Sequence, residues 1–170
     1  AKYFIASEEV EGGDGWEYNE IIPELQKNTI VPNKEFFTKI IQMSATSSWN
    51  STGTLSLVNL KKIGNIVTTC NEFANELQTM NKTVVINAIC DTKSFECSAY
   101  KDIIDFTNKI GTTKALNFAN SVKECIVANN NRTSNAYGMS LYFGTVTTTY
   151  QNHLFCKDTT WDEFLKIVFA

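Results

Sequence analysis

A short apolar run near the start of the chain, Tyr3–Ala6, constrains the fold more than any other feature. Its residues are continuously apolar and do not alternate with polar ones. This pattern is typical of a strand that is buried on both faces, as in a parallel sheet. Because such a strand needs neighbours, we expect the chain to begin inside a fold and to hold only part of the sheet.

Helical periodicity follows over most of the chain. Apolar residues keep a 3.6-residue period from Leu60 to Leu77, and Asn59 can cap this helix. Thr83–Ile86 is ambiguous, because its β-branched residues favour a strand while its place after a long helix favours a helix. Other helices are predicted at 17–26, from Pro32 and Asn33 onward, at 98–110, 114–128 and 161–169, and strands at 54–58 and 137–143. This alternation indicates the α/β class.

Composition argues against two kinds of partner. The 170 residues are 43% hydrophobic, enough for one domain with a real core, and the formal net charge is −3. The sequence contains no cluster of basic residues that would indicate nucleic-acid binding. No run of eighteen apolar residues suggests a membrane span. We therefore expect neither nucleic acid nor a membrane as a partner.

The five cysteines do not predict a metal site, because no pair has C-x-x-C spacing. Cys70 and Cys125 fall on apolar helical stripes, which predicts that they lie in the core. Cys90 and Cys97 flank a loop and could form a disulfide.

His153 is the only histidine, and Cys156 follows it three residues later. A Cys–His pair is the minimum for nucleophilic catalysis. No glycine-rich turn lies nearby to supply an oxyanion hole, so we interpret His153 as a surface or half-buried residue.

An acidic, glycine-rich loop follows the first strand. Residues 3–26 contain no Lys or Arg but seven acids, which are Glu8, Glu9, Glu11, Asp14, Glu17, Glu20 and Glu24. Three interpretations stay open: a solvated face, a calcium site, and a pocket for a basic side chain. A carboxylate just past a parallel strand lies where open α/β sheets bind ligands.

Three signatures together resemble a known family. These are Tyr3–Tyr18, Thr54–Leu60, and Tyr137–Phe143 followed by Thr160–Leu165. Their order and spacing are similar to the C-terminal half of the clostripain family of caspase-fold cysteine peptidases. The resemblance covers essentially the whole chain. It implies a caspase-like, mostly parallel sheet flanked by helices and incomplete in this chain. Residues 1–50 would belong to the catalytic core and 51–170 to a helical C-terminal subdomain.

The resemblance also implies where catalysis occurs. In this family the catalytic His and Cys lie on strands that precede the Ser-Glu-Glu loop, and no residue here matches them. The chain would then be part of a secreted cysteine endopeptidase that cleaves after Arg or Lys. Its partner would be the N-terminal chain that carries the Cys/His dyad. A non-catalytic caspase-like binding or scaffold module is the alternative.

Similar enzymes line the pocket for the P1 side chain with the residues just after this strand. Ser7 and Glu8 match that place best, with Ala6 and Glu9 beside them. Glu8 would select a basic P1 residue, and Trp16 would either wall the pocket or pack in the core. The resemblance implies no required cofactor and leaves calcium dependence open.

Overall fold

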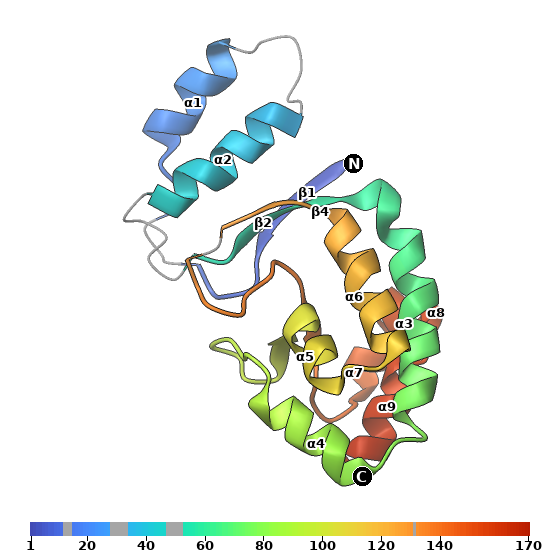
Figure 1. Ribbon diagram of the computed structural model, residues 1–170. Coiled ribbons are helices and arrows are strands. Elements are labelled where there is room, and N and C mark those ends of the chain that lie inside the picture. The colour runs from blue at the N-terminus through green and yellow to red at the C-terminus, as the bar shows by residue number, and fades with distance from the viewer. Residues whose placement is uncertain (12–14, 28–33, 47–52, 131) are drawn as a thin grey trace.

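The computed structural model describes residues 1–11, 15–27, 34–46, 53–130 and 132–170. In chain order the elements are β1 (Tyr3–Ser7), α1 (Tyr18–Lys27), α2 (Lys34–Thr46), β2 (Leu55–Asn59), a 3₁₀ turn (Leu60–Lys62), α3 (Ile63–Leu77), α4 (Lys82–Asp91), β3 (Tyr100–Asp102), α5 (Ile103–Ile110), α6 (Thr113–Cys125), β4 (Ile126–Asn129), β5 (Ser140–Tyr142), α7 (Thr148–Gln151), α8 (Leu154–Asp158) and α9 (Trp161–Val168). Helices α1 and α2 lie on one side of a small sheet, and the other helices gather on the opposite side (Figure 1). The predicted mixed α/β class is confirmed.

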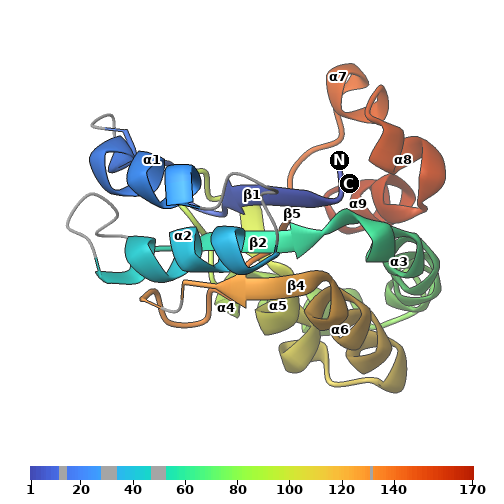
Figure 2. The same cartoon turned by 90° about the horizontal axis from the view of Figure 1, so that it is seen from above.

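The main sheet has the strand order β1-β2-β4, as Figure 2 shows from above. Both strand pairs are antiparallel, with Tyr3 opposite Asn59 and Ser56 opposite Asn129. The short strands β3 and β5 form a separate antiparallel pair. The mostly parallel sheet that we expected is therefore not seen among the described strands.

The reason is that an apolar run carries no information on strand direction, and the run in β1 does not mark a fully buried strand either. The pattern expected of a strand covered on both faces is found in β2, where residues 55–58 are all buried. In β1 no residue is fully buried, and Phe4 is 55% exposed.

A single large core joins the helices on one side of the sheet. Phe73 of α3 lies at its centre, with ring centroids 5.8 Å from those of both Phe106 and Phe118. Cys70 and Cys125 are completely buried in this cluster, as predicted. Smaller apolar clusters hold α1 and α2 against the sheet.

The long helix predicted at 60–77 is found as a 3₁₀ turn, Leu60–Lys62, followed by α3, and Asn59 caps the 3₁₀ turn and not α3. The Asn59 side chain accepts a hydrogen bond from the Lys61 N–H at 3.1 Å. The ambiguous stretch Thr83–Ile86 lies in helix α4, because Asn81 accepts the Thr83 N–H at 2.9 Å and starts a new helix there. Capping thus decides against the β-branched propensity.

Two predicted helices have wrong boundaries. The helix expected from 98 begins only at Ile103, because the Asp102 side chain caps it by accepting the Asp105 N–H. The helix expected to reach 128 ends at Cys125, and Ile126–Asn129 pair with β2 instead. Apolar residues at a helix end fit either element, and the open edge of β2 decides between them.

Other predictions need smaller corrections. The strand expected at 137–143 covers only Ser140–Tyr142. Thr160 and Glu163 have the spacing of a capping box, which predicts that Thr160 caps α9. Its side chain does not do so, and its hydroxyl lies 3.3 Å from Oδ1 of Asn75. Pro32 and Asn33 lie outside the described residues.

The expected boundary at residue 50 also lies outside the described residues, and it stays a prediction. The sheet takes β1 from one side of that boundary and β2 and β4 from the other. None of the helices described here combines the length and apolar character needed to cross a membrane.

Candidate functional site

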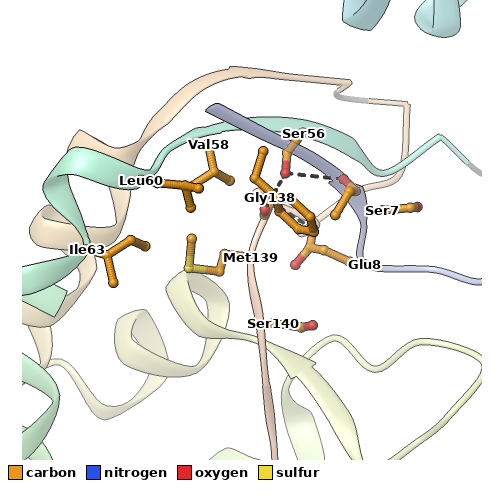
Figure 3. Close-up of a pocket in the computed structure, with 11 residues that line it drawn as sticks. Ser7, Glu8, Ser56, Val58, Leu60, Ile63, Gly138, Met139 and Ser140 are labelled. Atoms are coloured by element: carbon orange, nitrogen blue, oxygen red, sulfur yellow. Dashed lines mark hydrogen bonds between the residues drawn. The ribbon is translucent and has the colours of Figure 1, made fainter. Parts of the chain in front are cut away.

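A pocket of about 230 Å³ lies between the β1–β2 pair and the segment 138–140 (Figure 3). One wall is apolar and is formed by Val58, Leu60, Ile63 and Met139. The polar end carries Ser7, Glu8, Ser56 and Ser140. The pocket thus joins the first and third sequence signatures, which lie far apart in the chain.

The serines of this polar end are fixed by hydrogen bonds. The Ser7 hydroxyl lies 2.7 Å from the hydroxyl of Thr54. The Ser56 hydroxyl donates to the carbonyl of Gly138 at 2.7 Å. The first bond joins the end of β1 to the residue before β2, and the second joins β2 to the segment that precedes β5.

Glu8 is the most unusual residue of the pocket. Its Oε2 accepts a hydrogen bond from the Gly138 N–H at 2.8 Å, while Oε1 is buried. Burial, followed by the neighbouring Asp102 carboxylate, raises the pKa of Glu8 to about 9. At neutral pH Glu8 therefore carries a proton.

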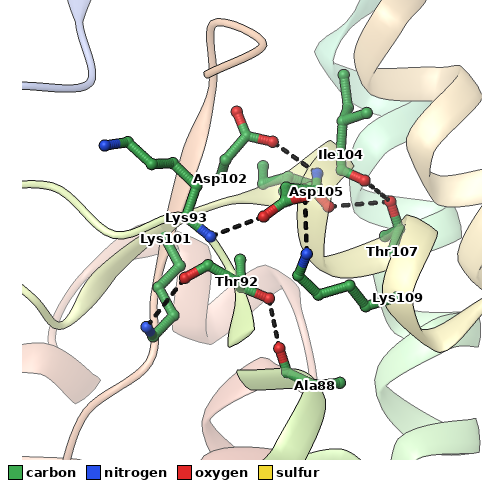
Figure 4. Close-up of polar contacts among 10 residues, drawn as sticks. Ala88, Thr92, Lys93, Lys101, Asp102, Ile104, Asp105, Thr107 and Lys109 are labelled. Carbon is green, nitrogen blue, oxygen red and sulfur yellow. Dashed lines mark hydrogen bonds and ion pairs between the residues drawn. The ribbon is translucent and has the colours of Figure 1, made fainter. Parts of the chain in front are cut away.

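Asp102 is the buried neighbour of Glu8 and comes from the end of β3. Its Oδ2 accepts the Tyr137 N–H at 2.6 Å, and its Oδ1 accepts the Asp105 N–H at 2.7 Å. Figure 4 shows Asp102 beside Asp105 at the start of α5. The sequence analysis missed Asp102, whose one signal is that of an N-cap.

Only some of the predicted substrate-binding residues line the pocket. Ala6, Ser7 and Glu8 line the pocket, whereas Glu9 and Trp16 lie outside its lining. Glu9 Oε1 accepts the N–H of Glu96 at 2.7 Å and so connects the acidic loop to the turn before β3. Trp16 packs in the apolar clusters around α2, and its indole N–H donates to Glu11 at 2.7 Å.

His153 and Cys156 do not form a catalytic pair. The Cys156 thiol donates to the carbonyl of Tyr150 at 3.2 Å, and burial raises its pKa. His153 is exposed, and its ring packs edge-on against Tyr150. All five cysteines are free, so the suggested disulfide between Cys90 and Cys97 is not formed.

A metal site was one interpretation of the acidic loop. Within the described residues, no three His, Cys, Asp or Glu side chains are grouped so that they could hold a metal ion. Asp14 lies outside those residues, and calcium binding stays a prediction.

The sequence model of the clostripain family matches residues 1–146 of the chain. The chain therefore belongs to the clostripain family, which relates it to cysteine peptidases. A comparison with curated proteins gives no match.

Proposed function

We propose that this chain forms the substrate-pocket side of a cysteine endopeptidase that cleaves after Arg or Lys. One observation carries the proposal: Ala6 and Ser7 at the end of β1, and Glu8 directly after it, line a pocket together with Gly138–Ser140. The catalytic Cys and His would come from an N-terminal part of the same peptidase. We also propose that the peptidase is secreted. A calcium titration of its activity would test whether it depends on this metal.

The chemistry of the pocket supports a long basic side chain. Val58, Leu60 and Met139 offer an apolar wall for the methylene groups of Arg or Lys. Ser7 and Glu8 offer oxygen atoms at the polar end, where a guanidinium or ammonium group would bind. The pocket thus presents apolar and polar surfaces in the order that such a side chain needs.

The free edge of β1 supports an N-terminal partner. Among the described strands, β1 is bonded only to β2, so its other edge is available to a further strand. Phe4 beside this edge is 55% exposed. A parallel strand from the N-terminal part would bring the dyad to the pocket and extend the sheet toward the caspase-like arrangement.

The reaction would be acyl transfer through a thioester. The Cys thiolate attacks the carbonyl carbon of the scissile bond, the amine leaves with a proton from His, and water then hydrolyses the thioester. This chain would hold the P1 side chain so that the scissile carbonyl lies in reach of the thiolate.

The test combines intact mass spectrometry of the native preparation with cleavage of peptide–fluorophore substrates that end in Arg, Lys, Gln or Asp. We expect a second chain that carries Cys and His, and preferential cleavage after Arg and Lys. Glu8→Ala should lower cleavage after Arg tenfold or more, about 1.4 kcal/mol. Glu20→Ala, which changes an exposed acid of α1, is the matched control and should retain activity.

Two results would contradict parts of this proposal. A single inactive species of 19.1 kDa would contradict the peptidase proposal and favour a non-catalytic binding module. Activity that is equal after all four P1 residues would contradict the proposed basic pocket.

A further inference from the structure

Two carboxyl groups, of the half-buried Glu8 and the fully buried Asp102, lie side by side at the polar end of the pocket. The successive amides of Tyr137 and Gly138 bind one oxygen of each, Asp102 Oδ2 at 2.6 Å and Glu8 Oε2 at 2.8 Å. Asp102 is completely buried, and its other oxygen accepts the Asp105 N–H. The chain thus holds two acidic side chains, from β1 and β3, on neighbouring peptide units.

Glu8 Oε1 has no ordinary partner. This atom is buried, and no donor within the described residues forms a hydrogen bond with it. The Asp102 carboxyl, held by the preceding amide, is the neighbour of Glu8 and lies close enough for a side-chain hydrogen bond between the two acids. Two carboxyl groups can form such a bond only when a proton lies between them.

The charged groups around the pair do not remove the need for that proton. Lys93 attracts the charge of Glu8, and Asp105 repels that of Asp102. Asp105 is itself bound by the Lys93 N–H at 2.7 Å and by Lys109 Nζ at 3.1 Å (Figure 4). Among the described ion pairs, none includes Glu8 or Asp102.

The other walls around Glu8 are uncharged. The β2 side contributes Ser56, and the segment before β5 contributes Gly138, Met139 and Ser140. Two ionised carboxylates in such a place would repel each other strongly, and one of them keeps its proton instead.

We propose that Asp102 is a positioning residue for Glu8, because the two side chains share one proton that fixes Glu8 in the pocket and keeps it neutral. The proton belongs to the pair, with Glu8 Oε1 as donor and the Asp102 carboxylate as acceptor. One consequence for substrate binding rests on the proposed function. A guanidinium that pairs with ionised Glu8 releases this proton to the solvent, so that recognition of a basic P1 side chain is linked to pH.

The test is a carbon-13 NMR titration of the carboxyl groups in the full chain of 170 residues. We expect Glu8 to stay protonated through neutral pH and to lose its proton near pH 9, far from the exposed glutamates. In Asp102→Asn the amide donates to Glu8 and carries no charge, so the Glu8 midpoint should fall by more than one pH unit. Asp162→Asn, which changes another buried acid, should leave that midpoint unchanged.

Either of two results would overturn the proposal. One is a wild-type Glu8 that titrates together with the exposed glutamates. The other is a Glu8 midpoint that does not move in Asp102→Asn.

A second variant keeps the test decisive if Asp102→Asn fails to fold. In Glu8→Gln the side-chain oxygen can still accept the Gly138 N–H, and the amide N–H₂ can take the place of the shared proton. Folded Glu8 binds a proton that the unfolded chain has lost above pH 4.5, so wild-type stability falls as pH rises from about 4.5 to 9. Urea unfolding should show this fall, and Glu8→Gln should show a smaller one. Identical slopes would overturn the proposal, and because neither readout uses cleavage, this failure is distinct from that of the proposed function.

Discussion

The amide of Gly138 donates a 2.8 Å hydrogen bond to the carboxyl of Glu8, across 130 residues of sequence. The carbonyl of Gly138 accepts the Ser56 hydroxyl at 2.7 Å. One peptide segment therefore connects β1, β2 and the approach to β5. Gly138 can do this because its φ is +104°, which residues with a side chain rarely adopt.

Gly138→Ala should damage this connection. The added Cβ would lie 2.9 Å from Cβ of Ser56 and 3.2 Å from Cγ of Asn129. We expect the free energy of unfolding, measured with urea, to fall by about 1–3 kcal/mol. Gly64→Ala is the control, because no atom lies within 4 Å of its Cβ and it should gain up to about 1 kcal/mol of helix propensity. Equal effects of the two variants would show that Gly138 is not required.

Phe73→Ala should test the centre of the large core. Phe73 is completely buried and packs against Phe106 and Phe118. Removal of its ring leaves a cavity, and we expect a loss of about 3–5 kcal/mol in the free energy of unfolding. Leu154→Ala, at a side chain that is 74% exposed, should change stability by less than about 0.5 kcal/mol. A small loss at Phe73 would contradict the packing described here.

Thiol labelling should distinguish the cysteines. Cys90 and Cys97 are exposed, whereas Cys70, Cys125 and Cys156 are buried. Burial raises the pKa of Cys70 to about 12, so its thiolate is scarce at neutral pH. With Ellman's reagent at pH 7.5 we expect two thiols to react quickly in the folded chain and all five after denaturation. A thiol that reacts far faster than free cysteine would indicate an activated nucleophile, which this arrangement does not contain.

Asp162 should give an effect of opposite sign to that of Glu8. Burial acts to raise its pKa, but the hydrogen bond and charge of Lys166, 2.7 Å away, together with hydrogen bonds to Glu163 and Gln151, outweigh burial and hold the pKa below its usual value. A lowered pKa stabilises the fold above pH 3.8, and this stabilisation is lost as pH falls through the folded-state value. Asp162→Asn should therefore weaken the acid-side dependence of stability, measured by circular dichroism between pH 2 and pH 5. Asp91→Asn, at an exposed acid, should keep the wild-type profile. An unchanged Asp162→Asn profile would contradict the ion pair.

Sequence patterns predict the elements that carry long, regular signals. Helix α3 carries the sustained apolar stripe that was predicted, and the predicted asparagine cap, Asn59, starts the 3₁₀ turn that leads into it. Strand β4 was missed because its first three residues, Ile126–Ala128, are apolar and continue the pattern of α6. Only the hydrogen bonds offered by β2 decide that these residues are a strand, and those bonds come from a distant part of the chain.

The residues of the candidate site also fall into those that the sequence predicts and those that it does not. Ala6, Ser7 and Glu8 could be proposed because they lie together directly after a recognisable strand. Asp102, the neighbour of Glu8, could not be proposed from the sequence, because only the folded chain brings the two residues together. For Trp16 the sequence left two positions open, because an aromatic residue beside an acidic loop fits a pocket wall and a core position equally well. In the structure Trp16 packs in the apolar clusters.

Because β2 lies between β1 and β4, the order of synthesis affects how the sheet forms. On the ribosome β2 emerges when β1 is already available, but β4 follows only after four further helices. Until β4 arrives, β2 has an open edge that can pair with other nascent chains. Translation between residues 59 and 126 is therefore the interval in which a holdase chaperone would protect this chain most.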